Sequence, residues 1–243
     1  MPRSLPTPEA VLITGAAKRI GKITAMHLAH RGYAVALHYN QAQREAIDLR
    51  DQIRRKGGRC EVFPCDLTSA AAMLSLVPRV IKIFPKLSVL INNASQFTKS
   101  RFREITLEQF HRDFSIHLMA PLFLSRDFSK FCKRGHIINI LDTHITSQKT
   151  QYFLYLLAKK SLHALTQMLA MELAPHFRVN AIAPGLILPP AGKGDRYLKK
   201  LSKKVPLKDK GDPWQIVQSV EFLLNNPCMT GQVIFNDGGE HLL

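Results

Sequence analysis

The chain contains 243 residues, of which 46% are hydrophobic, and this suits one sizeable domain (residues 1–243) with a full core. No apolar run approaches the length of a membrane span, and the first residues lack a signal-peptide pattern, so we expect a cytoplasmic protein with no membrane partner. The four cysteines are scattered without the spacing of a metal site, which favours reduced thiols and no bound metal.

Lysine and arginine number 34 against 18 acidic residues, which gives a formal net charge of +16. Such a positive net charge favours binding to nucleic acid, to an anionic membrane face or to small anionic ligands. One dense basic patch consists of Lys193, Arg196, Lys199, Lys200, Lys203, Lys204, Lys208 and Lys210. No helix-turn-helix, zinc-finger or RNA-binding motif accompanies the patch, so we expect no nucleic-acid partner. Generic solubility explains these charges at least as well as a specific polyanion site does.

Strand and helix patterns alternate along the chain. Apolar runs predict seven strands, at residues 10–14, 33–39, 60–65, 88–93, 135–141, 178–183 and 233–236. Helical spacing of apolar residues predicts helices at residues 20–31, 41–56, 69–84, 106–133, 152–175 and 213–224. Strands joined through helices imply a parallel sheet covered on both faces, that is, an α/β fold of the Rossmann type, doubly wound, with about seven strands.

A stretch rich in Pro, Gly and Lys follows the sixth predicted strand, at residues 184–205. Long loops in compact domains are usually functional or disordered, so we expect a substrate lid at about residues 184–210. The lysines of this lid could steer an anionic substrate, such as one with a folate glutamate tail, although plain solubility explains them almost as well.

A short loop from Thr14 to Gly21 joins the first predicted strand to the first predicted helix. A loop at this place holds a dinucleotide pyrophosphate with backbone N–H groups and the positive end of the helix. Gly15 permits the tight turn, and Gly21 allows close packing of the helix. Arg19 stands where a glycine-rich loop has its middle glycine, and its guanidinium can bind phosphate or reach over the cofactor towards a substrate.

The end of the second predicted strand bears on which dinucleotide is bound. An NAD site normally has Asp or Glu there, whereas this chain has His38, Tyr39 and Asn40. A carboxylate would repel a 2′-phosphate, so its absence favours NADPH. The full set of expected cofactor contacts is Gly15, Lys18, Arg19, Ile20, His38, Tyr39, Asn40, Asp66, Leu67, Asn93, Ala94, Ser95, Lys159, Pro184, Gly185 and Leu186.

Tyr155 and Lys159 are four residues apart, so they share one face if the segment is helical. A lysine cation beside a phenol stabilises the phenolate and lowers the tyrosine pKa, which makes the phenol a usable acid near neutral pH. Asp142 ends the apolar run at residues 135–141, where its carboxyl can sit against the phenol. A Tyr-x-x-x-Lys pair is common on surfaces and gains meaning only beside the cofactor loop. We expect Asp142, Tyr155 and Lys159 to be catalytic.

These motifs together resemble the short-chain dehydrogenase/reductase family over nearly the whole chain. The matching segments, in family order, are Thr14-Gly15 to Gly21, Asp66, Asn92-Asn93-Ala94, Tyr155-x-x-x-Lys159, Arg178-Val179-Asn180, Pro184-Gly185 and Asn236-Asp237-Gly238-Gly239. The resemblance implies a dinucleotide-binding reductase. Because family members are commonly tetramers that pair their long helices, we expect a homotetramer, although core packing explains the apolar residues of the predicted 152–175 helix equally.

Two departures from the family pattern narrow the resemblance. Asp142 stands where the family usually has serine, and Arg19 replaces a glycine. Both changes are features of the pteridine reductase branch, in which an aromatic residue matching Phe97 stacks on the pterin. By this resemblance the expected substrate contacts are Arg19, Ser95, Phe97, Asp142, Tyr152 and Tyr155.

His117 stands where the family has a helix asparagine that helps to hold a proton-relay water. This residue and the end of the chain resemble bacterial dihydromonapterin reductases, which also reduce dihydrofolate. The histidine puts the usual relay in doubt, while a hydrogen-bonded structural histidine explains it about equally.

The resemblance therefore implies NADPH-dependent reduction of a pterin or folate substrate: 7,8-dihydromonapterin, dihydrobiopterin or dihydrofolate would become its tetrahydro form. Phe97 and the nicotinamide would hold the flat ring, and Tyr155 would supply the proton. The alternative is a reductase with the same cofactor site and a carbonyl substrate, against which Asp142 and Phe97 argue.

Overall fold

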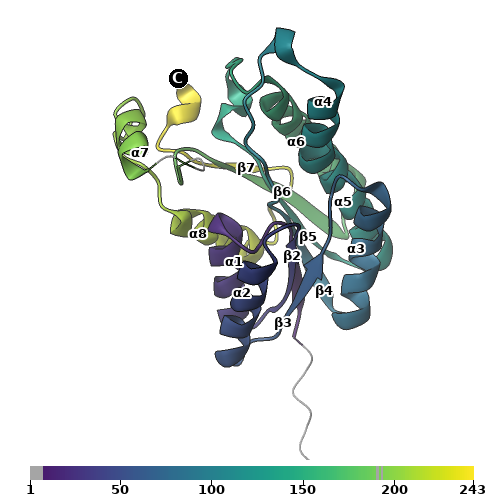
Figure 1. Ribbon diagram of the computed structural model, residues 1–243. Helices are drawn as coiled ribbons and strands as arrows, with labels where there is room; N and C mark the ends of the chain where they lie inside the picture. The colour runs from purple at the N-terminus through teal and green to yellow at the C-terminus, as the bar shows by residue number, and fades with distance from the viewer. Residues whose placement is uncertain (1–7, 190–191, 193) are drawn as a thin grey trace, which may run out of the picture.

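The computed structural model describes residues 8–189, 192 and 194–243. Within them, seven parallel strands form one sheet in the order β3-β2-β1-β4-β5-β6-β7 (Figure 1). The strands are β1 (Ala10–Ile13), β2 (Ala34–Tyr39), β3 (Cys60–Pro64), β4 (Leu87–Asn92), β5 (Gly135–Ile140), β6 (Phe177–Pro184) and β7 (Val233–Asn236). The predicted Rossmann-type sheet is confirmed.

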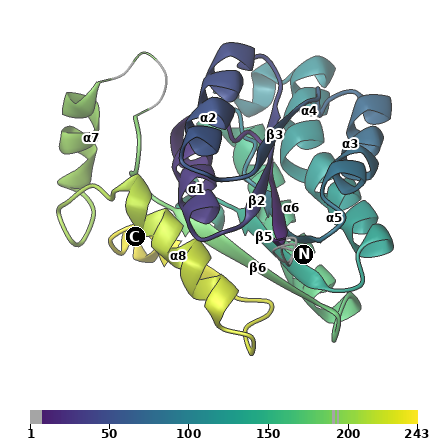
Figure 2. The ribbon, with the colours of Figure 1, turned by 90° about the horizontal axis from the view of Figure 1, so that it is seen from below.

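Helices cover both faces of the sheet because its strands are apolar on both sides (Figures 1 and 2). In β1, Val11 and Ile13 face one core, with α1 (Arg19–His30), α2 (Gln43–Arg55) and α8 (Pro213–Asn225). Ala10 and Leu12 face the other core, with α3 (Ala70–Ile83), α5 (Ala120–Phe131) and α6 (Phe153–Glu172). The two-residue alternation of β1 thus divides its side chains between two cores.

The carboxyl ends of the parallel strands share one edge of the sheet. From β1 the chain runs outward to β2 and β3, then returns to β4 on the other side of β1. Ligands of such sheets bind at this reversal, outside the carboxyl ends of the strands. The loops after β1, β4, β5 and β6 therefore bring residues 14–18, 93–97, 141–152 and 185–189 to one end of the molecule.

The helix predicted at residues 106–133 is interrupted, which corrects that prediction. It consists of α4 (Leu107–Phe114), a π-helical turn η2 (Ser115–Met119) and α5. Pro121 at the start of α5 has no N–H to donate to the carbonyl of His117, so the regular ladder cannot continue through this point. The turn places His117 in the interior, where its side chain is 1% exposed.

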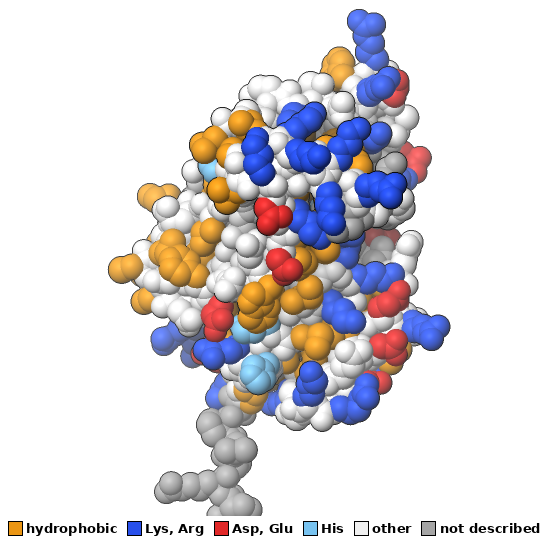
Figure 3. All heavy atoms as spheres, turned by 90° about the vertical axis from the view of Figure 1, so that its left-hand side faces the viewer, with side chains coloured by type: hydrophobic (Ala, Val, Ile, Leu, Met, Phe, Trp, Pro, Cys, Tyr) orange, Lys and Arg blue, Asp and Glu red, His pale blue; other side chains and the backbone are white. Residues whose placement is uncertain are grey.

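The stretch predicted as a loop at residues 184–205 contains a helix, α7 (Asp195–Ser202), which is a second correction. Its apolar side is short: Leu198 is buried, and Val205 just beyond the helix is buried as well. The exposed side carries Arg196, Lys199, Lys200 and Lys203, whose spacing puts them on one face. Figure 3 shows basic side chains gathered over this part of the surface. Lys193 of the predicted patch lies outside the described residues.

Among residues 8–189, 192 and 194–243, no helix combines the length and apolar character needed to cross a bilayer. The same residues hold no cluster of three or more His, Cys, Asp or Glu placed to share a metal ion. All four cysteines are free thiols, and burial raises the pKa of Cys60 to about 12 and those of Cys65 and Cys132 to about 11. These three thiols are therefore protonated at neutral pH.

Candidate active site

The loop after β1 is tied to the end of β4 by short hydrogen bonds. The Thr14 hydroxyl accepts from the amides of Asn93 and Ala94, both at 2.9 Å, and the Asn93 side chain donates to the carbonyls of Thr14 and Gly15. Gly15 has φ +62°, and a Cβ there would lie 2.9 Å from the Cα of Ala94. A side chain at residue 15 would thus fill the space through which the loop approaches β4.

The His38 side chain, whose ring is buried and neutral, supports this loop through a hydrogen bond. The Gly15 amide donates to Nδ1 at 2.9 Å, so Nδ1 has no proton and Nε2–H donates to the Cys65 carbonyl at 3.0 Å. Burial lowers the pKa of His38 to about 4. Both ring nitrogens are therefore committed to the backbone, so His38 shapes the loop through these two hydrogen bonds.

The start of α1 offers backbone donors to an anion. Lys18 caps the helix without a side-chain hydrogen bond, so the amides of the first turn are not satisfied by a cap. Lys18 itself forms an ion pair with Glu45 at 2.5 Å, which lowers the pKa of that carboxyl. Glu45 of α2 thus lies beside the start of α1 and shares the lysine charge.

Arg19 connects the loop after β1 to the segment after β6, which begins the predicted lid. Its backbone has φ +56°, a left-handed conformation that costs an L-residue about 1 kcal/mol and that glycine adopts freely. The guanidinium donates to the carbonyls of Pro189 at 2.9 Å and Leu188 at 3.3 Å. Arg19 therefore holds the lid over the loop in this structure, with its charge at the mouth of the site.

Asp142, Tyr155 and Lys159 come together at the carboxyl ends of β5 and β6. Tyr155 O–H donates to Asp142 Oδ2 at 2.9 Å. Lys159 Nζ donates to the Ile140 carbonyl at 2.6 Å and lies 5.8 Å from the Tyr155 ring centroid. Tyr155 and Lys159 are one turn apart on α6, and both are buried, as their spacing on one helical face requires.

The expected lowering of the tyrosine pKa by the lysine is not found. The pKa of Tyr155 is raised well above its usual value, first by burial and then by the charge of Asp142 and the hydrogen bond to it. Burial also lowers the pKa of Lys159 to about 8. The lysine points its ammonium at a carbonyl and the phenol meets a carboxylate, so Tyr155 keeps its proton at neutral pH and can give it only to a strongly basic acceptor.

Phe97 and Tyr152 form an aromatic wall beside Tyr155. Phe97 stacks on Tyr152 with ring centroids 4.0 Å apart at 23°, and it presents its edge to Tyr155 at 5.0 Å. The Phe97 side chain is 47% exposed, so a flat ligand ring can reach it. Burial raises the pKa of Tyr152, and the charge of Tyr197 on α7 adds a smaller effect in the same direction.

His117 orders the loop that carries Ser95 and Phe97. Its Nε2 accepts from the Gln96 amide at 3.1 Å and lies 3.1 Å from Ser95 Oγ, while Nδ1–H donates to the Asp113 carbonyl at 2.8 Å. Burial lowers its pKa to about 3, helped by the nearby Lys159 charge. His117 is a neutral hydrogen-bonded residue that still holds a helix carbonyl, which is one of the two interpretations left open by the sequence.

The remaining predicted contacts line the same end of the sheet. Asp66 accepts from the amide and hydroxyl of Thr68, and Leu67 is buried. Gly185 packs so closely that a Cβ would lie 2.6 Å from Asp237 Cβ. Asn40 is exposed at the end of β2. Three residues that sequence reasoning did not single out also lie here, beside Asp237 of the closing motif: His144, Lys149 and Glu240. The closing Asp237-Gly238-Gly239 motif was the available signal.

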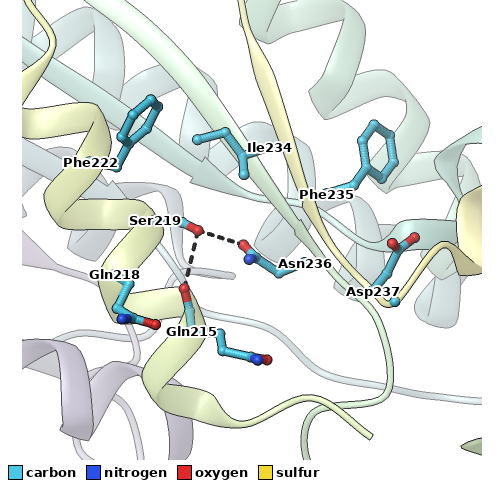
Figure 4. A pocket seen from close by; sticks show the side chains of 9 residues that line it. Gln215, Gln218, Ser219, Phe222, Ile234, Phe235, Asn236 and Asp237 are labelled. Carbon is cyan, nitrogen blue, oxygen red and sulfur yellow. Dashed lines mark hydrogen bonds between the residues drawn. The ribbon is translucent and has the colours of Figure 1, made fainter. Parts of the chain in front are cut away.

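A separate open hollow of about 590 Å³ lies between α8 and β7 (Figure 4). Ser219 Oγ donates there to Asn236 Oδ1 at 2.7 Å. None of the residues Asp142, Tyr155 and Lys159 lines this hollow. The hollow therefore lies along the edge strand β7 and meets the candidate site only at Asp237 and Gly238.

A phosphate-binding turn after β1, together with a buried Tyr–Lys pair at the carboxyl ends of the strands, defines a dinucleotide-dependent oxidoreductase. Comparison with known sequences agrees with this class: the family described as Enoyl-(Acyl carrier protein) reductase matches residues 15–241. The chain belongs to the short-chain dehydrogenase/reductase family.

Individual relatives differ in what they act on. An uncharacterized oxidoreductase of Methylorubrum extorquens is 30% identical over 240 residues, covering 95% of this chain and 97% of the relative. NADPH-dependent aldehyde reductase 1 of Arabidopsis thaliana is 30% identical, covering 95% and 85%. The structure of FolM alternative dihydrofolate reductase 1 from Brucella canis, complexed with NADP, is 33% identical, covers 99% and 97% of the two chains and superposes with a TM-score of 0.92.

Proposed function

We propose that the protein catalyses the NADPH-dependent reduction of a dihydropterin, such as 7,8-dihydromonapterin, dihydrobiopterin or dihydrofolate, to the tetrahydro form. The observation that carries the proposal is the 2.9 Å contact between Tyr155 and Asp142 beside the exposed face of Phe97. A carboxyl group can pair with two adjacent nitrogen sites on the edge of a pterin, which a serine hydroxyl at this position cannot do.

The residues of the site fit a dinucleotide. Gly15 and Gly21 leave no room for a side chain, since a Cβ at residue 21 would lie 2.6 Å from the Asn93 side chain, and this keeps the cradle open to backbone contacts. The helix amides after Lys18 would hold the pyrophosphate, Lys159 the nicotinamide ribose, and Pro184 and Gly185 would border the nicotinamide. Bound NADPH would supply a hydride to the substrate carbon. The NADP complex of the Brucella canis reductase supports this cofactor.

Within the protein, each group of the site has a separate task. Phe97 and Tyr152 would bind the flat ring, so that the reacting carbon is oriented before the chemical step. Tyr155 would give its proton to the ring nitrogen of the C=N bond, and a raised pKa suits an acid that must stay protonated until the nitrogen becomes strongly basic. Asp142 would hold the phenol and the polar edge of the pterin together.

The rival function is reduction of a carbonyl with the same cofactor, and the 30% identity with an aldehyde reductase favours it. A carbonyl oxygen has no second nitrogen site for Asp142 to bind. This difference makes the dihydropterin the better substrate for this site.

The test follows NADPH oxidation by absorbance with 7,8-dihydromonapterin, dihydrofolate and a panel of aldehydes and ketones, each repeated with NADH. The proposal expects turnover of at least one dihydropterin with NADPH, and a tetrahydropterin product identified by mass. Turnover of carbonyl substrates alone would establish the rival function.

A further inference from the structure

The second carboxyl oxygen of Asp142, Oδ1, contacts polar groups that lie between Tyr155 and solvent. Oδ1 accepts from the backbone N–H of His144 at 2.8 Å and lies 3.4 Å from the His144 ring nitrogen Nδ1. The other ring nitrogen, Nε2, lies 2.7 Å from Lys149 Nζ. The Lys149 side chain is 54% exposed, whereas those of His144 and Asp142 are 23% and 19% exposed. A continuous row of polar atoms therefore joins bulk water to Tyr155.

The Lys149 ammonium determines which group donates and which accepts in each contact of this row. An ammonium group has only donors, so His144 Nε2 must accept from Lys149 and cannot carry a hydrogen of its own. The proton of the neutral imidazole is then on Nδ1, where it faces Asp142 Oδ1. His144 and Asp142 thus each present an acceptor on their solvent side: Nε2 of His144 accepts from Lys149, and Asp142 Oδ1 faces His144 Nδ1–H. At the end of the row, Asp142 Oδ2 accepts from Tyr155 O–H.

Glu240 at the start of η4 (Glu240–Leu242) holds this arrangement. Its Oε1 lies 3.6 Å from His144 Nε2 and 3.8 Å from Lys149 Nζ, and burial raises its pKa. The other oxygen, Oε2, is buried and has no hydrogen-bond partner among the described residues, and it faces Gly185. Glu240 thereby keeps the lysine and the imidazole together at the edge of the site.

Other charged groups around His144 are already engaged. Asp237, after β7, accepts from the Thr143 hydroxyl and from the amide and ring of His241. From α6, Lys160 directs its ammonium to the Ser147 carbonyl and the Gln148 side chain, and Lys159 directs its own to Ile140. Asp142, Lys149 and Glu240 are therefore the groups to which His144 responds.

We propose that Lys149 and His144 form a proton relay that reloads Asp142 and Tyr155 from solvent after each turnover. The inference rests on the proposed function only in requiring that Tyr155 give up a proton to the substrate. His117, at the asparagine position of the family relay, has no free ring nitrogen, since both are bonded to Asp113 and the 95–96 loop. The chain therefore supplies a second route, which reaches the phenol through Asp142.

The step balances one proton in and one proton out. Once Tyr155 O–H has protonated the substrate nitrogen, His144 Nδ1–H passes its proton to Asp142 Oδ1, and Lys149 gives one of its ammonium protons to Nε2. Rotation of the Asp142 carboxyl about its Cβ–Cγ bond brings the new O–H to the phenolate, which takes the proton. The Lys149 amine recovers its proton from water, so no group is oxidised or reduced.

The kinetic test uses His144→Asn and Lys149→Met, with His111→Asn on the exposed side of α4 as the matched control. We expect kcat to fall about 100-fold in His144→Asn, at the lower end of what a positioned acid or base contributes. KM and the affinity for NADPH should stay within a factor of about 3, the solvent deuterium isotope effect on kcat should rise, and added imidazole should restore part of the rate. An unchanged kcat and isotope effect, or a loss that imidazole does not restore, would overturn the relay.

A second measurement does not depend on turnover. The ¹⁵N shifts of the His144 ring at neutral pH should report the Nδ1–H tautomer in the wild-type protein, and Lys149→Met should shift the population towards Nε2–H. An Nε2–H tautomer in the wild type contradicts the relay even if the protein is an active reductase. Conversely, an Nδ1–H ring in a protein that reduces only carbonyls would leave the relay standing and remove the dihydropterin function.

Discussion

The cofactor loop and the catalytic group lie at the same end of the sheet but are built differently. Around Gly15, neutral buried groups meet at 2.8–3.1 Å: the Thr14 hydroxyl, the Asn93 amide and the His38 ring. Around Asp142, ionisable and partly exposed side chains face one another, with His144 2.7 Å from Lys149, 3.4 Å from Asp142 and 3.6 Å from Glu240. The first region is held by neutral hydrogen bonds, whereas the second consists of groups that can exchange protons.

The largest effect should follow the loss of the phenol hydroxyl. Tyr155→Phe removes the proton donor but keeps the ring against Phe97 and His117, so we expect turnover of a dihydropterin to fall about 100-fold to 1000-fold. The affinity for NADPH, measured by quenching of its fluorescence, should change by less than about 3-fold. Tyr33→Phe, at a half-buried tyrosine outside the site, serves as the control. Near-normal turnover by Tyr155→Phe would show that the phenol is not the proton donor of this site.

The region held by neutral hydrogen bonds should instead respond to acid through its histidines. Burial holds the pKa of His38 at about 4 and that of His117 at about 3, both below the unfolded value of 6.5. Above pH 6.5 both states are neutral, and below it only the unfolded chain takes up these protons, so the free energy of unfolding falls as the pH drops. Each histidine should cost roughly 2 kcal/mol between pH 6.5 and pH 5.

Urea unfolding at pH 7.5, 6.5 and 5 measures this slope. His117→Asn, which removes the titrating ring, should flatten the slope by about half of that expected from the two histidines together. His30→Asn, at an exposed histidine at the end of α1, should leave the slope unchanged. Equal slopes in the wild type and His117→Asn would mean that the ring is not held neutral.

An intermediate effect is expected at the aromatic wall. Phe97→Ala removes a stacking surface and should raise the KM for a dihydropterin about 10-fold, because aromatic stacking contributes about 1 kcal/mol beyond the area that it buries. The value of kcat should change less, since Tyr155 and Asp142 are untouched. Phe102→Ala, at a more exposed phenylalanine, is the control. An unchanged KM in Phe97→Ala would remove the stacking role.

The smallest effect concerns the lid. If the basic face of α7 steers an anionic tail, the double variant Lys199→Glu, Lys200→Glu should raise the KM for dihydrofolate about 3-fold at low salt and leave that for 7,8-dihydromonapterin unchanged. Lys130→Glu with Lys133→Glu, at the far end of α5, controls for net charge. Equal effects on both substrates would favour solubility as the reason for these lysines.

The sequence predicted the fold well because its signals were local. Short apolar runs such as residues 135–140 are typical of strands buried on two faces, and the turn at Gly15 indicates that a helix follows, which begins at Arg19. Helix α7 was missed because lysines dominate its composition and only Leu198 and Ser202 are buried within it. The interruption at η2 was missed because Pro121 was compatible with an ordinary helix start.

The candidate site was predicted in part. The grouping of Asp142, Tyr155 and Lys159 followed from motif spacing, but the partners of their charged atoms did not. Whether Lys159 meets a phenol or the Ile140 carbonyl depends on a difference of a few ångströms that spacing does not encode. Glu240 reaches the site from the end of the chain, about a hundred residues after Asp142, and no local pattern marks that contact.

The central claim is that the carboxyl of Asp142 suits this site to a dihydropterin. The most direct measurement compares kcat/KM for 7,8-dihydromonapterin in the wild type and in Asp142→Ser and Asp142→Ala, with NADPH affinity determined for each protein. We expect rapid turnover in the wild type, a loss of about 100-fold or more in both variants, and NADPH affinity nearly unchanged. Turnover by Asp142→Ser at the wild-type rate would contradict the claim.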